Sequence, residues 1–328
     1  MMGADFTIRF SDGRITVHRH RRIPAKRINP GRGRIMNYTI ANDRLTVQIS
    51  SRGGELQSII RDGREYLWQA DPAFWDEKAP NLFPYIARMT EGKYTLDGVT
   101  YHMPIHGFIH VTELAMEEQS GERIVFRLDA NEETRACYPY EFTYRVIYEL
   151  DGDMLNTTYQ VENHDGKTMY FGIGGHPGFL VPMEDGLNFE DYYLEFGGQK
   201  EYDTPVKIGI SPTCFVDGKD TPYPLTDGNK IPLKHSLFDD DAIVLTHMPK
   251  TVSIKSDKGE RRVTVSYPDM DYVGFWHATR SEAPYVCIEP WSSLPSRQDI
   301  VEDLSTQPGL KSVQSGGVYR NSWSVEIL

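Results

Sequence analysis

The amino-acid sequence predicts an all-β protein, built as a large antiparallel twisted β-sandwich. Three observations support this fold class. Short segments of alternating apolar and polar residues follow one another along the chain, turn residues such as Asp-Gly separate them, and few stretches sustain a helical period. In addition, 39% of the 328 residues are hydrophobic and 25% are charged, which is typical of a chain that folds around a sizeable core.

The first alternating segments after Met36 are predicted β-hairpins. In each of them, two short runs rich in apolar or β-branched residues flank a pair of residues that favours a tight turn. The two hairpins cover residues 39–49 around Asn42-Asp43 and residues 95–101 around Asp97-Gly98.

The middle and the end of the chain are predicted to form the longer strands of an antiparallel meander. Residues 123–128, 142–148 and 155–161 alternate with period two, and Asp151-Gly152 supplies a turn between the last two segments. The same pattern returns in residues 251–254, 262–267 and 322–327. Because no linker, low-complexity tract or repeat interrupts this pattern, we expect a single domain from residue 36 to residue 328.

Residues 1–35 differ from this domain in their charge. They carry the run His18–Arg22 and further Lys and Arg residues, whereas Asp5 and Asp12 are their acidic residues. Such a segment suits an arm that binds nucleic acid or an anionic surface. We favour the simpler interpretation of a basic N-terminal extension, non-native to the domain or disordered, because the sequence from Met36 has the character of a natural start. Residues 6–10 and 14–17 would still suit a hairpin.

Properties of the whole chain exclude several classes of protein. The net charge of −12 argues against nucleic acid as the main partner, because phosphate binding needs a concentrated basic surface. No stretch approaches the ~18 apolar residues of a membrane span, and no signal-peptide pattern is present. We therefore expect a cytoplasmic protein, monomeric or dimeric, without a membrane partner. Cys137, Cys214 and Cys287 are odd in number and widely spaced, which predicts reduced, buried thiols and no disulfide framework.

The first of three patches with a titratable side chain is Pro104–Phe108. Gly107 would allow a close approach of the backbone, and Phe108 would offer a flat apolar face beside His106. The alternative is that His106 is a structural histidine.

The second patch, Gly172–Phe179, contains four glycines, and His176 is its only ionisable side chain. Glycines weaken an ordinary strand, so they either clear room for a ligand beside His176 or form a bulged turn. A phosphate-binding loop is excluded, because neither a strand-to-helix pattern nor a Lys-Ser/Thr pair accompanies the glycines.

The third patch, Val286–Trp291, is an apolar strand that carries Glu289. Glutamate is rarely buried without a partner, and burial would raise the pKa of Glu289 towards the range of a general base. The alternative is a glutamate at the end of a strand that points to water.

The three patches offer two imidazoles and one carboxylate. They contain neither the elbow motif of Ser-His-Asp hydrolases nor the His-Glu-x-x-His spacing of zinc enzymes. A metal site of His106, His176 and Glu289 for Zn²⁺ or Fe²⁺ is an alternative that no motif supports.

From Met36 to the C-terminus the sequence resembles the aldose 1-epimerase family, the galactose mutarotase-like enzymes, and especially their less characterised bacterial branch. Several motifs in the same order carry this resemblance. They are Asn81–Arg88 with Gly92-Lys93-Tyr94, His106-Gly107-Phe108, Gly175–Phe179, Ser236–Ile243 and Cys287–Trp291.

The resemblance implies a β-supersandwich fold, no cofactor, and a sugar whose α and β anomers the protein interconverts by acid–base ring opening and closure. It implies that His176 is the acid that protonates the ring oxygen and that Glu289 is the base that takes the proton of the anomeric hydroxyl. It also implies that His106 holds or polarises the ring oxygen and that Arg88 binds sugar hydroxyls.

Other substrate-binding residues are less closely defined. Asp241 is the expected sugar-binding aspartate, with Asp239 and Asp240 as alternatives. Trp291 is expected to contact the sugar. The rings of Trp276, Trp291, Phe108 and Phe179 could stack on its apolar face, although large rings are ordinarily buried and each of them is more typical of a core residue.

Two features depart from the pattern of the well-characterised members, so the preferred sugar does not follow from the resemblance. Ala87 stands where they have Asn, and Met-Pro-Ile precedes His106 in place of a more polar run. Two alternative functions also follow from the sequence. One is a sugar-binding or sensing protein without turnover, and the other is a mutarotase for sugar phosphates that uses Arg88, Lys93 and Arg297.

Overall fold

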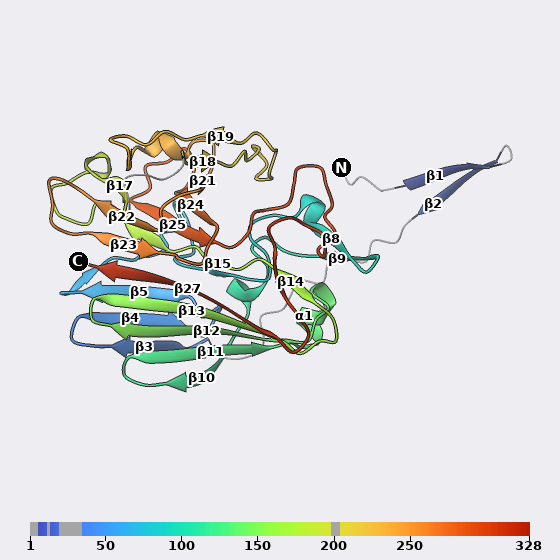
Figure 1. The fold of residues 1–328 in the computed structure, drawn as a ribbon, viewed down its shortest axis with the longest axis horizontal. Helices are drawn as coiled ribbons and strands as arrows, with labels where there is room; N and C mark the ends of the chain where they lie inside the picture. The colour runs from blue at the N-terminus through green and yellow to red at the C-terminus, as the bar shows by residue number, and fades with distance from the viewer. Residues whose placement is uncertain (1–5, 12–13, 20–34, 198–203) are drawn as a thin grey trace.

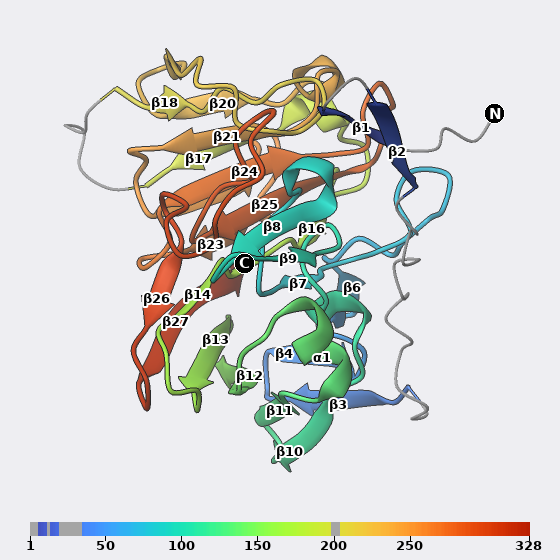
Figure 2. The ribbon, with the colours of Figure 1, turned by 90° about the vertical axis from the view of Figure 1, so that its right-hand side faces the viewer.

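A computed structural model describes residues 6–11, 14–19, 35–197 and 204–328. Over these residues the chain is built mainly from antiparallel strands, which confirms the predicted all-β sandwich (Figure 1). Figure 2 shows the body turned by 90°, with β17 (Tyr193–Phe196), β21 (Ile243–Thr246) and β24 (Tyr272–Trp276) above β11 (Arg123–Asp129) and β12 (Phe142–Asp151).

The larger main sheet has nine strands in the order β10-β11-β12-β13-β27-β23-β22-β17-β20. The last strand of the chain, β27, lies between β13 and β23 and so joins the two halves of this sheet. The strands are β10 (Ala115–Gln119), β11 (Arg123–Asp129), β12 (Phe142–Asp151), β13 (Met154–Asn163), β17 (Tyr193–Phe196), β20 (Lys230–Pro232), β22 (Thr251–Lys255), β23 (Val263–Ser266) and β27 (Val318–Ile327).

The second main sheet has the order β19-β18-β21-β24-β25-β15-β7, and β16 also pairs with β25. In this sheet β25 is buried at every position. The strands are β7 (Asn81–Leu82), β15 (Gly174–Gly175), β16 (Gly178–Leu180), β18 (Val206–Lys207), β19 (Thr221–Pro222), β21 (Ile243–Thr246), β24 (Tyr272–Trp276) and β25 (Tyr285–Trp291).

Smaller elements complete the body. A four-stranded sheet contains β3 (Asn37–Ala41), β4 (Leu45–Ser50), β5 (Leu56–Arg61) and β6 (Arg64–Glu65). Two-stranded sheets are formed by β8 (Lys93–Leu96) with β9 (Val99–His102) and by β14 (Met169–Phe171) with β26 (Lys311–Val313). The helical turns are α1 (Glu132–Cys137), η1 (Thr90–Gly92), η2 (Ile109–Val111), η3 (Phe189–Asp191) and η4 (His235–Phe238).

The hairpins and the meander predicted from the sequence are confirmed. Strands β3 and β4 pair around Asn42-Asp43, and β8 and β9 pair around Asp97-Gly98. The meander is β11, β12 and β13, and residues 251–267 contain the pair β22 and β23. The short helix α1 was not expected, and its capping box explains it, because Asn131 accepts a hydrogen bond from the backbone of Thr134 while the Thr134 side chain accepts one from Asn131.

A buried hydrogen-bond network fixes the position of β7 between the sheets. The Nδ2 atom of Asn81 donates to the carbonyl oxygens of Gly53 and Gly54, at 2.9 and 3.0 Å, and its Oδ1 accepts from Tyr159 OH at 2.7 Å. Because Asn81 also pairs with Gly175, this network holds β15 and the adjoining His176 against the core.

The basic N-terminal segment lies partly outside the described residues. Strands β1 (Phe6–Ser11) and β2 (Arg14–Arg19) form the hairpin that the sequence suits, whereas its turn and most of the run His18–Arg22 are not described. Among the described strands, β1 and β2 make a sheet of their own.

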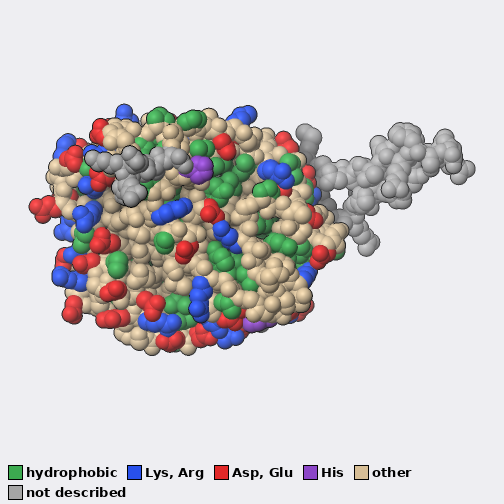
Figure 3. Space-filling model, viewed as in Figure 1, with side chains coloured by type: hydrophobic (Ala, Val, Ile, Leu, Met, Phe, Trp, Pro, Cys, Tyr) green, Lys and Arg blue, Asp and Glu red, His purple; other side chains and the backbone are tan. Residues whose placement is uncertain are grey.

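The described surface agrees with the mixed, acidic composition. Figure 3 shows acidic and basic side chains interspersed over one face of the body. No helix in the described part of the chain combines the length and the hydrophobicity needed to cross a membrane.

Candidate active site

The geometry of β25 and its neighbours places His176 opposite Glu289. Gly174 pairs with Trp291, and Gly178 pairs with Cys287. His176, midway between the two glycines, therefore faces Glu289, midway between Cys287 and Trp291. Residues directly opposite each other in an antiparallel pair lie on the same face of the sheet. The His176 Nε2 atom lies 3.2 Å from Glu289 Oε2.

Glu289 is buried, which agrees with its interpretation as a buried carboxyl and not with a side chain that points to water. It is 1% exposed, and its Oε1 has no hydrogen-bond partner among the described residues. Burial, reinforced by the negative charge of Asp241, raises the pKa of Glu289 well above its ordinary value. A buried carboxyl oxygen without a protein partner suits a site that a polar ligand completes.

Burial acts on His176 in the opposite direction. It lowers the pKa of His176 to about 4, so the imidazole is neutral near pH 7. Together, the raised pKa of Glu289 and the lowered pKa of His176 favour a neutral pair. In this pair the Glu289 carboxyl holds the one proton that the two groups can exchange. Since the Oε2 and Nε2 atoms are 3.2 Å apart, a small proton displacement converts this state into a carboxylate beside an imidazolium.

The glycines around His176 permit close packing. A Cβ atom on Gly174 would lie 2.6 Å from the Pro290 carbonyl oxygen, and one on Gly175 would lie 2.9 Å from the Trp323 ring. The space that side chains would take is therefore filled by neighbouring strands. Of the two interpretations of Gly172–Phe179, the one in which these glycines clear room for a ligand is therefore wrong.

On the other side of Glu289, the strand β24 places no side chain against the carboxyl. Gly274 is the residue that pairs with Glu289, and a Cβ atom there would lie 3.6 Å from Glu289 Oε2. The absence of a side chain at Gly274 thus keeps the immediate surroundings of the carboxyl clear of a cross-strand neighbour.

His106 lies beside His176 and presents a defined hydrogen-bond donor. The two ring centroids are 5.6 Å apart, and the Nδ1 atom of His106 accepts a hydrogen bond from the Ala87 backbone N–H at 3.2 Å. Burial and the neighbouring His176 lower the pKa of His106 well below its ordinary value, so the ring is neutral. With Nδ1 as acceptor, the proton of the neutral ring is on Nε2.

The local backbone explains the position of this imidazole. His106 and Gly107 both have positive φ angles, 60° and 72°, and a Cβ atom on Gly107 would lie 2.2 Å from the Phe83 carbonyl oxygen. The close approach predicted at Gly107 is therefore present. Phe108, however, is fully buried in the core and offers no face to a ligand, so that expectation is wrong.

Asp241 lies on the Glu289 side of the site. Its Oδ1 accepts a hydrogen bond from the Ala242 backbone, and its Oδ2 lies 2.7 Å from the Cys214 Sγ atom that donates to it. Asp239 and Asp240, the alternatives, are exposed. Cys214 is half-buried, in contrast to the expected burial of all three cysteines, because its loop contributes to the site.

Arg88 also interacts with residues of this site. Its side chain is exposed, it contributes to the low pKa of His106, and it interacts with the Cys214 thiol. Lys93 and Arg297, the other candidate phosphate ligands, are each held by a carboxylate. Lys93 pairs with Glu91 at 2.5 Å, and Arg297 pairs with Glu302 at 2.8 Å.

The aromatic rings near the pair are not all those expected. Trp75 and Trp276 pack on His176, with ring centroids at 5.0 and 5.7 Å, and both are half-buried. Trp291 is 4% exposed and packs in a small buried cluster with Leu82 and Val244, although its Nε1 has no partner among the described residues. Phe179 is fully buried in the core, as the ordinary preference of large rings for burial predicts, and is not available to stack on a sugar.

Sequence reasoning missed three residues that the fold brings to this place: Trp75, His110 and Cys214. The ring of His110 lies 6.4 Å from that of His106, and burial lowers its pKa to about 4. Its position four residues after His106 was a usable signal. Trp75 and Cys214 stand in loops whose local sequence carries no comparable pattern.

One group in the described part of the chain has side chains close enough to bind a metal ion together. It comprises His176, Cys287 and Glu289, whose nearest ligand atoms lie within 4.8 Å of one another. His106 is outside this group. Burial raises the pKa of both Cys287 and Glu289 well above their ordinary values, so each would have to lose a proton before it bound a cation.

The sequence matches a known protein family and a known relative. A sequence model of the aldose 1-epimerase family matches residues 36–304. Protein LacX of Lactococcus lactis is 33% identical over 307 residues, which cover 89% of this chain and all of that protein.

Solved structures give the same picture. A galactose mutarotase related enzyme from Lactobacillus acidophilus is 35% identical and superimposes with a TM-score of 0.85 over 89% of this chain and 97% of its own. A galactose mutarotase-like protein from Lactobacillus casei is 30% identical, with a TM-score of 0.84 over 89% of this chain and all of its own.

Proposed function

This chain belongs to the aldose 1-epimerase family, and we propose that it is a mutarotase that interconverts the α and β anomers of an unphosphorylated aldose, with His176 and Glu289 as its acid–base pair. The observation that carries the proposal is the buried contact of 3.2 Å between His176 Nε2 and Glu289 Oε2. It provides one proton donor and one proton acceptor on the same sheet face.

The reaction requires two proton transfers. Glu289 takes the proton of the anomeric hydroxyl, the bond between C1 and the ring oxygen breaks, and His176 delivers a proton to the ring oxygen. Rotation about C1–C2 in the open aldehyde exposes the other face of the carbonyl. Ring closure then runs the same transfers in reverse, so each turnover returns the single shared proton to the pair.

Substrate binding itself favours the required protonation state. In the empty site burial holds the proton on Glu289, whereas a sugar hydroxyl that donates to the carboxylate and a ring oxygen that accepts from the imidazolium both favour the ionised pair. His106 supports the same state, because its Nε2–H can donate to the ring oxygen without carrying a charge.

The remaining contacts are proposed as sugar-binding contacts. Arg88 and Asp241 would bind hydroxyl groups, and Trp75 and Trp276 would pack against the apolar face of the ring. Trp291 would contribute through its unpartnered Nε1 rather than by stacking. Because Lys93 and Arg297 are already paired with carboxylates, a phosphorylated sugar is disfavoured.

Polarimetry of freshly dissolved α-D-glucose and α-D-galactose tests the proposal. We expect the protein to accelerate mutarotation of at least one aldose, and we expect His176→Asn and Glu289→Gln each to lower kcat by about 10²–10⁴-fold. The exposed Glu282→Gln variant is the control. A protein that binds sugars but leaves their mutarotation rate unchanged would be a binding or sensing protein instead.

A chelator experiment separates this chemistry from a metal-dependent one. Mutarotase activity should survive prolonged treatment with EDTA, because His176 and Glu289 act through protons. Loss of activity that one added metal restores would favour the group of His176, Cys287 and Glu289 as a metal site.

A further inference from the structure

Trp75, in the loop between β6 and β7, packs on the ring of His176. The two ring centroids are 5.0 Å apart, with an angle of 36° between the ring planes, and a Cβ atom on Gly178 would lie 3.2 Å from the Trp75 ring. Trp276 and Tyr285 contact the same indole, with centroids at 5.5 and 5.8 Å. Packing against β16, β24 and β25 therefore fixes the Trp75 ring relative to His176.

Backbone hydrogen bonds also join the Trp75 loop to the segment that carries His176. The His176 N–H donates to the Pro80 carbonyl, and the Gly178 N–H donates to the Lys78 carbonyl. The loop and the imidazole are therefore parts of one packed unit, so a change at Trp75 affects the surroundings of His176.

Glu77, two residues after Trp75, is a hydrogen-bond partner of this indole. The Trp75 side chain forms a hydrogen bond with the Glu77 carboxyl, and an indole takes part in such a bond only as a donor, through its Nε1–H. Trp75 thereby connects a carboxyl group, which the proposed mechanism does not use, to the proposed acid His176.

Several charges act on the half-buried Glu77 carboxyl. Burial, together with the negative charges of Glu55 and Asp76, raises the pKa of Glu77 to about 7, whereas the positive charge of Arg52 and the hydrogen bond from Trp75 oppose this rise. The charge of Glu77 therefore changes in the neutral pH range.

The charge of Glu77 can act on His176 through the Trp75 ring. A carboxylate that accepts the indole N–H makes the indole more electron-rich, and an aromatic face attracts a cation within about 6 Å of its centroid. The His176 ring, at 5.0 Å, lies within this range. Ionised Glu77 thus favours the imidazolium form of His176, and a protonated carboxyl, as a weaker acceptor, does so less.

We propose that Glu77 is a positioning residue for the proposed acid: through the indole N–H it holds the Trp75 ring against His176, and its carboxylate form favours the imidazolium. The inference rests on the proposed function, in which this imidazolium protonates the ring oxygen of the sugar.

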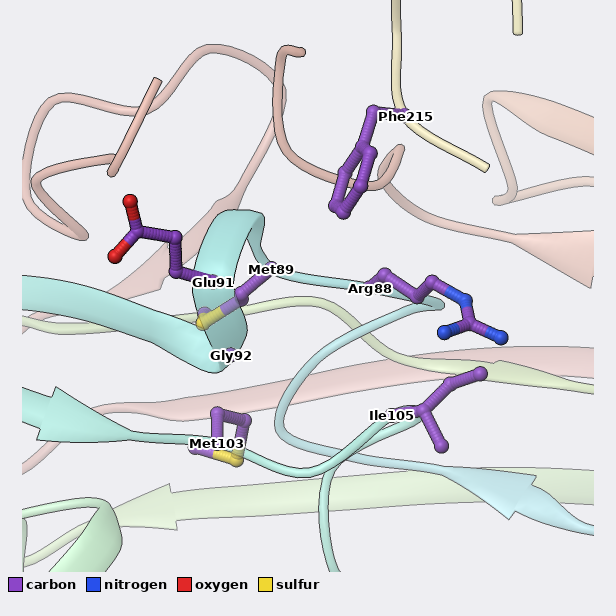
Figure 4. A pocket seen from close by; sticks show the side chains of 7 residues that line it. All are labelled: Arg88, Met89, Glu91, Gly92, Met103, Ile105 and Phe215. Carbon is purple, nitrogen blue, oxygen red and sulfur yellow. The ribbon is translucent and has the colours of Figure 1, made fainter. Parts of the chain in front are cut away.

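The Glu77–Trp75 pair is separate from a cavity of about 290 Å³ that Arg88 helps to line. Figure 4 shows Phe215 and Ile105 on opposite sides of this cavity. Neither Trp75 nor Glu77 belongs to its lining, so substitutions in the pair leave the side chains of the cavity unchanged.

NMR of the protein with ¹³C-labelled histidine tests the contact without turnover. The His176 ring signals, assigned by their loss in His176→Asn, should shift with a midpoint near pH 7, because ionisation of Glu77 polarises the indole beside them. Glu77→Gln keeps an oxygen acceptor but cannot ionise, so this shift should disappear. In the matched control Asp76→Asn it should remain, with a lower midpoint, because Asp76 raises the pKa of Glu77.

Kinetics test the effect on the reaction. With a sugar whose mutarotation the protein accelerates, we expect kcat to rise about threefold as the pH passes through 7 and to be level on either side. Because burial lowers the pKa of His176 to about 4, this step lies apart from the protonation of the imidazole.

Two variants assign the kinetic step. Glu77→Gln should abolish it, and in a Trp75→Phe background, which lacks the indole N–H, Glu77→Gln should have no further effect. The exposed Glu282→Gln variant is the control and should keep the step.

Failure of this inference and failure of the proposed function give different results. The inference is refuted if the His176 signals or the kcat of Glu77→Gln keep the pH dependence of the native protein, or if native kcat is constant through pH 7. An equal effect of Glu77→Gln with and without the Trp75 indole would also refute it. If the signals depend on Glu77 but no sugar undergoes faster mutarotation, the positioning contact stands and the proposed catalytic function fails.

Discussion

The proposed acid–base pair of His176 and Glu289 includes a buried ionisable group that lowers the stability of the fold. Glu289 is 1% exposed, and burial raises its pKa well above the value of an unfolded chain. The native state therefore binds a proton that the unfolded state releases once the pH exceeds about 4.5. Folding consequently loses stability as the pH rises through the interval between these two pKa values.

The substitution Glu289→Gln should remove this loss of stability at higher pH. We expect the free energy of unfolding to increase by about 1–2 kcal/mol near pH 8 and to change little near pH 4.5, because glutamine does not ionise. Urea unfolding at the two pH values measures the difference. The control Glu282→Gln, at an exposed position, should show no such dependence on pH, and an unchanged stability of Glu289→Gln at pH 8 would contradict the burial argument.

The pH dependence of activity follows from the shared proton. In the proposed mechanism the pair must hold a single proton, so we expect activity to fall when His176 and Glu289 are both protonated and when both are deprotonated. Because the pKa of His176 is lowered to about 4, we expect the acid limb of kcat/KM near pH 4, with the alkaline limb where the pair loses its remaining proton. Stopped polarimetry across the pH range measures both limbs. An acid limb near pH 6.5, the value of an unperturbed histidine, would contradict this interpretation.

Cys214 offers a test of how Asp241 is oriented. Burial, with the neighbouring carboxylate, raises the pKa of the Cys214 thiol to about 11, so the thiol stays protonated and donates to Asp241. We expect Cys214→Ala to raise KM about fivefold with a smaller change in kcat, since one hydrogen bond of about 1 kcal/mol is lost. Cys214→Ser, which keeps a donor, should recover most of the affinity. Equal KM values for both variants and the native protein would show that the contact does not orient the carboxylate.

At the scale of elements, β25 organises the site through the two short strands beside it. Strands β15 and β16 pair with β25 in one register, and His176 and Pro177 separate them. The position of the imidazole therefore depends on how closely β15 approaches β25. Gly174 permits a close approach, because a Cβ atom there would lie 2.6 Å from the Pro290 carbonyl oxygen and 3.1 Å from the Trp291 ring.

Gly174→Ala should move His176 away from Glu289. The added methyl group would lie 2.6 Å from the Pro290 oxygen, so the strand must shift, and we expect a loss of about 1–3 kcal/mol in the free energy of unfolding together with a clear loss of kcat. The control is Gly121→Ala, where nothing lies within 4 Å of the added atom. Thermal unfolding and polarimetry of both variants measure the effect. Similar behaviour of the two variants would contradict the role of close packing at Gly174.

At the scale of the whole molecule, the two main sheets and their connecting loops supply the site from segments far apart in sequence. Arg88 and His106 come from loops of the N-terminal half, His176 follows β15, Asp241 precedes β21 and Glu289 lies on β25. The basic residues 1–35 contribute none of these groups, and the match to the family model begins at residue 36.

We therefore propose that residues 36–328 fold and act as one domain without the preceding segment. A protein that begins at Met36 should keep the circular dichroism spectrum and the mutarotase activity of the full chain, and its melting temperature should change by no more than about 2 °C. Insolubility of the shortened protein, or loss of its β-sheet spectrum, would show that the hairpin of β1 and β2 is an integral part of the body.

Much of the fold could be predicted from the sequence because its determinants are local. Alternation with period two and turn pairs such as Asp97-Gly98 specify hairpins wherever they occur, and these predictions are confirmed. The order of strands in the sheets, in contrast to the hairpins, does not follow from local sequence patterns. That β27 lies between β13 and β23 depends on contacts between residues more than fifty positions apart, which no local pattern encodes.

For the candidate site, the sequence by itself determined the residue types and the family pattern: a histidine after glycines, a glutamate in an apolar strand, and the likeness to aldose 1-epimerases. Only the tertiary structure decided which side chains meet. It brought Trp75 to His176 and His110 to His106, paired Lys93 and Arg297 with carboxylates, and buried Phe108 and Phe179 in the core. The reason is that the pKa of a group and its access to a ligand depend on burial and neighbouring charges, and these arise only when distant strands pack together.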